Sequence, residues 1–263
     1  MFIQKKIVTF ICLFFVASLV IGQNSKNKQV KVLSFNILHG ATTKGDFNLD
    51  VIAKVIKDAD ADFVSLQEVD YKTNRSKKYD LATELGYRTK MTSVFGRAMY
   101  YDGGEYGEAV LSKYTFLNSR NVALPYTKGN EPRAALEVTT VLKSGDTISF
   151  IGTHLDHLRT DTDRVSQATA INRVFSKNRY PTILSGDLND IPNSNAISIL
   201  ESFWKASYKK SNPKLTYPSN HPKSKIDYVM FYPHNKWKVI SRKTICDTVA
   251  SDHCGYLVTL ELQ

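Results

Sequence analysis

The chain has 263 residues, of which 42% are hydrophobic and 23% are charged, as in an ordinary globular protein. This length exceeds an average domain but suits one large α/β domain. No internal repeat, low-complexity tract or linker follows residue 28, which excludes a repeat array. The formal net charge of +10 favours anionic partners such as phosphate esters, nucleic acid or anionic lipid. The charge does not choose among them, and a basic solvated surface explains it equally well.

The N-terminus has the pattern of a targeting segment. A basic stretch at 1–6 precedes an apolar run at 7–21, and polar residues follow from Gln23. Because the apolar run is short for a membrane span, we expect a secretory signal peptide at 1–22, then a flexible mature N-terminus at 23–29. This predicts a secreted or periplasmic protein, and a retained membrane anchor is the alternative.

Removal of this segment leaves two cysteines, Cys246 and Cys254. In an oxidising compartment they could pair and close a small loop around 251–253. The chain-entropy relation gives such a loop about 2–3 kcal/mol of stabilisation. Two separate, half-buried thiols are the alternative.

The N-terminal half begins with alternating strand and helix patterns. Residues 29–37 alternate and are rich in β-formers, which predicts a strand. Apolar residues at helical spacing predict a helix at 48–59 with Asn48 as its cap, and a second helix is expected at 76–85. The remaining strand patterns of this half lie at 62–66, 88–101, 105–112, 116–124, 133–142 and 147–153.

The C-terminal half mixes the same elements. Helices are expected at 161–177 and 197–204, with Thr160 or Asp161 capping the first, and a polar loop at 207–223. Strand patterns lie at 181–184, 225–232, 237–244 and 255–262. Together, βα units and long β-meanders suggest two mixed sheets packed together with helices outside.

Polar side chains gather where the predicted strands end. The stretch 185–190 supplies Asp187 and Asn189, which strand alternation would place on the same side. A carboxylate beside an amide suits a site that activates water and holds an oxyanion, although an Asx turn after a strand explains this stretch alone. Similar endings recur at Asn36, Glu68, His154, Asp227, and Asp252 with His253. Oxygen ligands without cysteine suit Mg²⁺, Mn²⁺ or Ca²⁺ better than zinc.

Six short motifs occur in a characteristic order: LSFNILHG, LQEVD, GTHLDH, SGDLND, KIDYV and SDH. Any one is weak, but the ordered set resembles the endonuclease/exonuclease/phosphatase superfamily across essentially all of 30–262. This group includes pancreatic-type deoxyribonucleases, inositol-polyphosphate phosphatases and neutral sphingomyelinases. The resemblance implies a catalytic domain at 30–263 with a four-layer α/β sandwich fold, two mixed β-sheets packed face to face with helices outside. It also implies metal-dependent hydrolysis of phosphate esters, with Mg²⁺ as the expected cofactor and Mn²⁺ or Ca²⁺ as alternatives.

By matching motif, the resemblance implies that Asn36 and Glu68 lie at the principal metal, with Glu68 as the direct carboxylate ligand. Asp252 would be a further carboxylate, either on the metal side or in a hydrogen bond. Asp187 would orient or deprotonate the attacking water, and Asn189 would hold a phosphate oxygen. A divalent ion neutralises phosphate charge and polarises the P–O bond, which is consistent with this division.

The histidines have implied roles at the phosphate. His253 would bind phosphate and act in acid–base chemistry, oriented by Asp227. His154 would contact the phosphate or protonate the leaving oxygen. An imidazole paired with a carboxylate can stabilise charge at a pentavalent phosphorus.

A second set of residues is assigned to substrate binding. Arg75 and Arg133 could grip a second phosphate or a headgroup bidentately, and Asp156 could line the site. Glu108 could orient His154. Each of these side chains could equally have a structural role only.

Three functions compete for the same motifs. The first is a secreted phosphodiesterase or phosphatase acting on a small or lipid-linked phosphate. The second is a nuclease, although only the loop at 205–225 is notably basic. The third is a non-catalytic binding module, whose expected signature is loss of Glu68, Asp187 or His253, and none is lost. The expected partners are therefore a phosphate ester, with nucleic acid or membrane lipid as alternatives, and we expect a monomer.

Overall fold

The computed structural model describes residues 28–263. The predicted signal peptide at 1–22, and all but the last two residues of the predicted flexible segment at 23–29, lie outside the described residues. Gln29 itself is already the first residue of strand β1. Within residues 28–263, no helix combines the length and the apolar character needed to cross a membrane.

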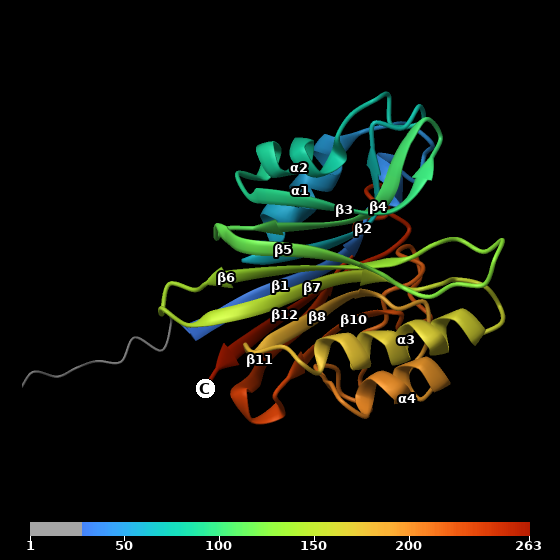
Figure 1. Ribbon diagram of the computed structural model, residues 1–263. Helices are drawn as coiled ribbons and strands as arrows, with labels where there is room; N and C mark the ends of the chain where they lie inside the picture. Colours follow the sequence, from blue (N-terminus) through green and yellow to red (C-terminus); the bar gives the residue numbers. More distant parts are fainter. Residues whose placement is uncertain (1–27) are drawn as a thin grey trace, which may run out of the picture.

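Two six-stranded mixed sheets form the centre of the protein (Figure 1). The first has the order β11-β12-β1-β2-β4-β3, with β1 at Gln29–Asn36, β2 at Phe63–Tyr71, β3 at Thr92–Tyr101, β4 at Gly104–Ser112, β11 at Trp237–Ile245 and β12 at Gly255–Leu262. The second has the order β5-β6-β7-β8-β10-β9, with β5 at Phe116–Ala123, β6 at Ala134–Val141, β7 at Thr147–His154, β8 at Thr182–Asp187, β9 at Lys205–Ala206 and β10 at Asp227–Tyr232.

Four helices cover the outer faces of the sheets (Figure 1). They are α1 at Leu49–Ala59, α2 at Leu81–Thr89, α3 at Thr162–Phe175 and α4 at Asn195–Glu201, and short 3₁₀ turns lie at Leu38–Gly40 and His234–Lys236. Asn48 caps α1 as predicted, because its side chain accepts a hydrogen bond from the Asp50 amide. Asp161 is the N-cap residue of α3, but its side chain makes no capping hydrogen bond.

Three apolar clusters hold these layers together. The middle cluster joins the facing sides of the two sheets, for example Phe63 of the first sheet and Phe150 of the second, whose rings lie 5.1 Å apart. A second cluster packs α1 and α2 on the first sheet, and a third packs α3 and α4 on the second. The predicted four-layer α/β sandwich is therefore confirmed.

The element bounds differ most around α2. The helix predicted at 76–85 begins at Leu81 instead, because the Asp80 side chain caps it at the Thr83 amide. Lys90 then ends α2 in the left-handed conformation, so the strand predicted from residue 88 begins at Thr92. The short strand β9 falls next to the expected polar loop and was not predicted.

Strand direction brings the polar strand ends to one edge. Parallel pairing of β7 with β8 sets His154 beside Asp187, and antiparallel pairing of β8 with β10 sets Asp187 beside Asp227. Asp227 is the first residue of β10, and His253 lies just before the first residue of β12. The sequence pattern instead predicted both residues at the C-terminal end of a strand. Antiparallel strands start at the edge where their neighbours finish, so all of these groups reach the same edge.

Candidate active site

A pocket of about 510 Å³ opens at this edge of the two sheets. Of the eleven residues predicted for the site, nine line it; Asp227 and Asp156 do not. The lining residues outside that predicted set are His39, Met99, Tyr101, Tyr106, Glu131, His157, Tyr217 and Ile226. Among these, His39 and Glu131 were missed by the sequence analysis. His39 stands three residues after Asn36 in the ILHG stretch, which is the only signal that could have indicated it.

Glu68 lies inside a strand rather than at its end, contrary to the prediction. The pairing of β2 with β4 shifts between Leu66 and Val69, and Glu68 has a φ of 57° at this bulge. Such a conformation is uncommon for a residue with a Cβ, and bulges of this kind re-aim side chains beside active sites. The bulge therefore explains how Glu68 turns into the pocket from the middle of β2.

Asn36 connects the two carboxylates of the pocket. Its Nδ2 donates to Glu68 Oε1 at 3.1 Å and to Asp187 Oδ2 at 3.2 Å. His39 Nδ1 lies 3.4 Å from the other oxygen of Glu68. Although burial opposes its charge, these contacts with His39 and Asn36 lower the pKa of Glu68, so the side chain is a carboxylate at neutral pH.

Asp187 and Asn189 both line the pocket, but not through strand alternation. Strand β8 ends at Asp187, and Asn189 has a φ of 50° in the following turn. The Asn189 amide donates to Asp187 Oδ1 at 2.9 Å, so the two residues are joined by an Asx turn. The prediction that they project together is confirmed, and its stated reason is wrong. Asp190, the last residue of this stretch, pairs with Arg164 at 3.2 Å and so has a structural role.

His253 lies between two buried carboxylates. Its Nδ1 is 3.1 Å from Asp227 Oδ2, and its Nε2 is 3.6 Å from Asp187 Oδ2. Burial opposes a positive charge here, but Asp227 and Asp187 outweigh it and raise the pKa of His253 to about 10. Burial also raises the pKa of Asp187 to about 7. At neutral pH the ring is therefore a cation, and Asp187 is close to its titration midpoint.

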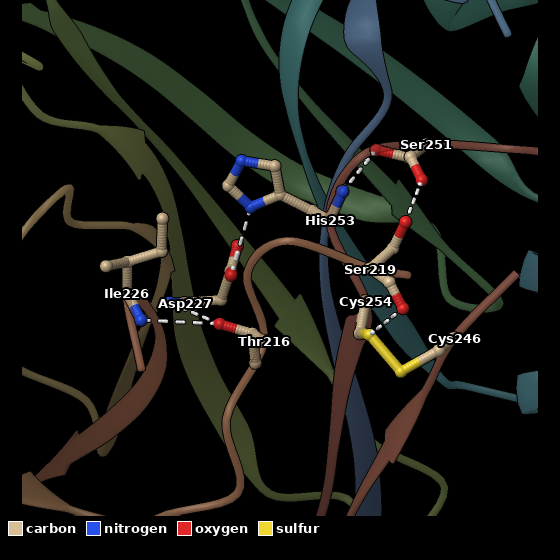
Figure 2. The surroundings of a disulfide bond; sticks show 8 residues. All are labelled: Thr216, Ser219, Ile226, Asp227, Cys246, Ser251, His253 and Cys254. Carbon is tan, nitrogen blue, oxygen red and sulfur yellow. Dashed lines mark hydrogen bonds and ion pairs between the residues drawn. A yellow bond between two sulfur atoms is a disulfide. The ribbon is translucent and has the colours of Figure 1, made fainter. Parts of the chain in front are cut away.

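A disulfide joins Cys246 to Cys254, directly after His253 (Figure 2). The loop that it closes is tied to the sheets by hydrogen bonds: Ser251 Oγ donates to the Asn36 carbonyl at 2.7 Å and accepts from the His253 amide at 3.0 Å. Ser219 Oγ donates to the Ser251 carbonyl at 2.7 Å, as Figure 2 shows. The disulfide therefore closes the segment that carries Asp252 and His253.

Arg133 is buried beneath two histidines. Its Nη1 lies 3.0 Å from His154 Nδ1, and its Nη2 lies 3.1 Å from His157 Nδ1. Since a guanidinium can only donate, His154 Nδ1 must accept, and the ring proton must lie on Nε2. Burial and the Arg133 charge both lower the pKa of His154 well below its ordinary value, so this ring is neutral.

His154 Nε2, on the other side of the ring from Arg133, has a contact that competes with this placement of the ring proton. Asn189 Nδ2 lies 2.9 Å from His154 Nε2 and also donates to the Leu155 carbonyl at 3.0 Å. A neutral ring cannot accept at both nitrogens, and the buried Arg133 cannot lose its proton. We therefore assign the accepting role to Nδ1 and the proton to Nε2, which lies 3.6 Å from Asp187 Oδ2, beyond hydrogen-bond distance.

Two predicted or suspected residues take other positions. Asp156 is buried outside the pocket and accepts from the Leu158 amide at 3.0 Å, so it holds a turn rather than lining the site. Gln167 of α3 accepts from the Asp156 amide at 2.9 Å and holds the same turn. Glu108 does not orient His154: within the described chain it has no hydrogen-bond partner, and burial raises its pKa well above the ordinary value. Arg133 occupies the orienting position instead.

The oxygen donors of the pocket fit a hard divalent cation. Glu68 and Asp252 are close enough that, together with burial, Glu68 raises the pKa of Asp252, and a cation between them would relieve this repulsion. Asp187, Asp227 and His253 also have ligand atoms within 4.8 Å of one another. In this second group the cationic His253 is hydrogen-bonded to Asp227 and ion-paired with Asp187, so its charge already balances the carboxylates. Glu68, Asn36 and Asp252 remain as the oxygen donors that could hold a cation.

Comparison with known proteins points to the same kind of molecule. A family model described as "Endonuclease/Exonuclease/phosphatase family" matches residues 33–253. Similar solved structures include an endonuclease/exonuclease/phosphatase from Bacteroides vulgatus, at 22% identity over 89% of this chain and 99% of that chain, with a TM-score of 0.71. Another is the Bacteroides thetaiotaomicron mannosyl-6-phosphatase, at 19% identity over 88% and 99%, with a TM-score of 0.70. The human Nocturnin catalytic domain with a bound sulfate anion matches at 17% identity over 90% and 96%, with a TM-score of 0.67. At these identities the structures show a shared fold.

Proposed function

The chain belongs to the endonuclease/exonuclease/phosphatase family, whose members are hydrolases of phosphate esters, and on this premise we propose that it is a divalent-metal-dependent hydrolase of a small or lipid-linked phosphate ester. The observation that carries the proposal is the convergence of Glu68, Asp187 and His253 on one pocket. A non-catalytic binding module on this fold has no need for a carboxylate near neutral pKa beside a cationic imidazole.

The residues of the pocket divide the work of hydrolysis at phosphorus. Asp187, with a pKa raised to about 7, is suited to accept the proton of the attacking water. The cationic His253, held by Asp227, stabilises the negative charge that develops on the phosphoryl oxygens. His154 contributes a neutral Nε2–H donor, so its expected role becomes contact with the phosphate rather than protonation of the leaving oxygen.

The proposed metal site is formed by Glu68, Asn36 and Asp252, with Mg²⁺ as the expected ion and Mn²⁺ or Ca²⁺ as alternatives. When bound there, a divalent cation neutralises phosphate charge and polarises the P–O bond. Asn36 holds the Glu68 and Asp187 carboxylates close to each other, because its amide donates to both.

A substrate panel tests this function. The panel contains a phosphomonoester, a phosphodiester, sphingomyelin, an inositol phosphate and plasmid DNA, each with Mg²⁺ and with a chelator, and Asp187→Ala serves as the inactive control. The proposal predicts Mg²⁺-dependent hydrolysis of at least one small or lipid-linked ester by the wild type. If wild type and Asp187→Ala both react only at the background rate on every substrate, the proposed function is rejected.

A nuclease is the second candidate, favoured by the net charge of +10 and by the lysines of the loop after β9. Tyr217 of this loop lines the pocket, with its ring 4.9 Å from the His253 ring. Hydrolysis of plasmid DNA alone in the same panel would establish this alternative.

Secretion to the periplasm or beyond is part of the proposal. Two features support it: the signal-peptide pattern at 1–22 and the Cys246–Cys254 disulfide, which is typical of oxidising compartments. Intact mass after alkylation without reductant, on protein recovered from each cell fraction, reports both the cleavage site and the disulfide. We also propose that the protein acts as a monomer, which sedimentation at two concentrations checks.

A further inference from the structure

The pocket contains a second oxyanion receptor, formed by Arg75, that takes no part in the chemistry described above. We propose that Arg75 binds a second phosphate or carboxylate on the substrate, so that the preferred ester is a small molecule with two anionic groups. This inference rests on the proposed hydrolase function and specifies its substrate class. The receptor is built by the segment after β2 and by the β3–β4 hairpin.

The guanidinium of Arg75 is fixed in place by a buried carboxylate. Arg75 Nε and Nη2 donate to the two oxygens of Asp70 at 2.7 and 2.8 Å, and Asp70 is fully buried. Thr73 Oγ1 also donates to Asp70 at 2.6 Å, which fixes the carboxylate in turn. A side chain held this way loses little rotamer freedom when it binds a ligand.

The backbone that carries Arg75 is equally constrained. Asp102, at the tip of the β3–β4 hairpin, accepts from the Arg75 amide at 2.7 Å and from Asn74 Nδ2 at 3.1 Å. Thr73 Oγ1 accepts from the Ser76 amide at 3.2 Å within the same turn. The turn and the hairpin therefore form one unit that presents Arg75 to the pocket.

The donors of the Arg75 guanidinium that Asp70 does not use indicate which kind of ligand the side chain would bind. The bidentate pair with Asp70 uses two of its five N–H donors, and Nη1 has no hydrogen-bond partner among residues 28–263. Tyr101 and Tyr106 cover the planar face, with ring centroids 4.6 and 5.5 Å from the guanidinium carbon. The remaining Nη donors form a planar fork, which matches the oxygens of a phosphate or carboxylate.

The location of the receptor limits the size of the ligand. Arg75 is 30% exposed and lines the same 510 Å³ pocket as Glu68 and His253. Its anchor Asp70 follows Glu68 by two residues in β2. Both ends of one small ester, about the size of a hexose bisphosphate, therefore fit the pocket together.

Matched pairs of esters test this inference. Fructose 1,6-bisphosphate and fructose 6-phosphate differ only in the second phosphate, and p-nitrophenyl phosphate reports the basal reaction. We expect the wild type to prefer the bisphosphate in kcat/KM by roughly 10- to 100-fold, as for a charge-assisted hydrogen-bonded pair. Arg75→Lys, which keeps the charge but loses the fork, should lose most of this preference through a higher KM for the bisphosphate.

The controls separate folding, function and inference. Arg97→Lys is the matched variant, because Arg97 also pairs with a carboxylate, Glu105, and lies over a tyrosine, but does not line the pocket. It should keep the full preference, and thermal melts verify that both variants fold. A wild type that hydrolyses p-nitrophenyl phosphate but shows no preference, or a preference unchanged by Arg75→Lys, overturns the inference alone. Hydrolysis of DNA but of neither sugar phosphate also overturns it, whereas inactivity on every ester rejects the hydrolase function itself.

Discussion

Asp187 Oδ2 lies 3.6 Å from Nε2 of His253, in a buried site where one group carries negative charge and the other positive. Burial, partly offset by His253, raises the pKa of Asp187 to about 7. A base with a raised pKa is active only above that pKa, so kcat/KM should fall as the pH drops through about 7. Since a bound cation stabilises the carboxylate, this acidic limb should move to lower pH at saturating metal.

The alkaline side of the same profile depends on His253. Its pKa of about 10 keeps the ring cationic well above neutral pH. Asp227→Asn removes one of the carboxylates responsible, so the alkaline limb should move to lower pH in that variant. Rates measured from about pH 5 to about pH 10 at two metal concentrations check both limbs. A flat wild-type profile between about pH 5.5 and 8 at the lower metal concentration contradicts the role given to Asp187.

The contact between Arg133 and His154 predicts a single imidazole tautomer. In the wild type, ¹⁵N chemical shifts should show Nδ1 of His154 unprotonated and Nε2 protonated over the neutral pH range. Arg133→Lys keeps the charge but loses the fork to both histidines, so we expect a mixture of tautomers and a roughly 10- to 100-fold lower kcat. His234, whose Nε2 contacts the Phe203 carbonyl far along the chain, serves as an internal reference. A wild-type ring protonated at Nδ1 would refute the assignment.

Lys225 predicts an unusual pH dependence of stability. It is buried over the Tyr256 ring, 3.2 Å from the centroid, and its Nζ donates to the Asp227 carbonyl. Burial lowers its pKa from 10.5 to about 7. Between these values the unfolded chain binds a proton that the folded protein does not, so the contribution of Lys225 to the free energy of unfolding increases as the pH rises through this window.

The measurement compares wild type with Lys225→Met by denaturant unfolding. The variant should be the more stable protein at neutral pH, and its advantage should shrink by roughly 2–4 kcal/mol as the pH is raised toward 10. Lys210→Met, at an exposed lysine, should show no such trend. An advantage that stays constant or grows with pH would be inconsistent with a neutral buried amine.

The disulfide predicts a loss of stability on reduction. Its loop spans a sequence separation of 8, for which the chain-entropy relation gives about 2–3 kcal/mol. Cys246→Ala/Cys254→Ala should lose about this much free energy of unfolding and should no longer respond to dithiothreitol. If reductant leaves the wild-type midpoint unchanged, the bond does not stabilise the fold.

Much of this site follows from the sequence because it depends on where strands begin and end. Apolar runs indicated the strands, and the polar residues at their ends converge once parallel and antiparallel pairing are both considered. Asn36, Asp187 and His154 could be placed at one edge on that ground alone. The order of the motifs added the family and, with it, the four-layer fold.

Other features depend on tertiary contacts that leave no local pattern. The bulge at Glu68 is visible only once β2 is paired with β4. Arg133 reaches His154 across two neighbouring strands, and nothing in either segment predicts which nitrogen it contacts. Glu108 has the sequence pattern of an ordinary charged residue, yet its side chain is fully buried on β4, between β2 and β3 of the first sheet. The start of α2 was missed because the cap at Asp80 competes with equally polar residues before it.

The central claim is that water attacks phosphorus in the pocket of Asp187 and His253. Hydrolysis of a phosphomonoester in H₂¹⁸O with Mg²⁺, followed by mass spectrometry of both products, tests it most directly. We predict one solvent ¹⁸O in the released phosphate, none in the alcohol, and no reaction by Asp187→Ala or in the presence of chelator. Solvent label in the alcohol, or labelled phosphate formed equally well by Asp187→Ala, would contradict the claim.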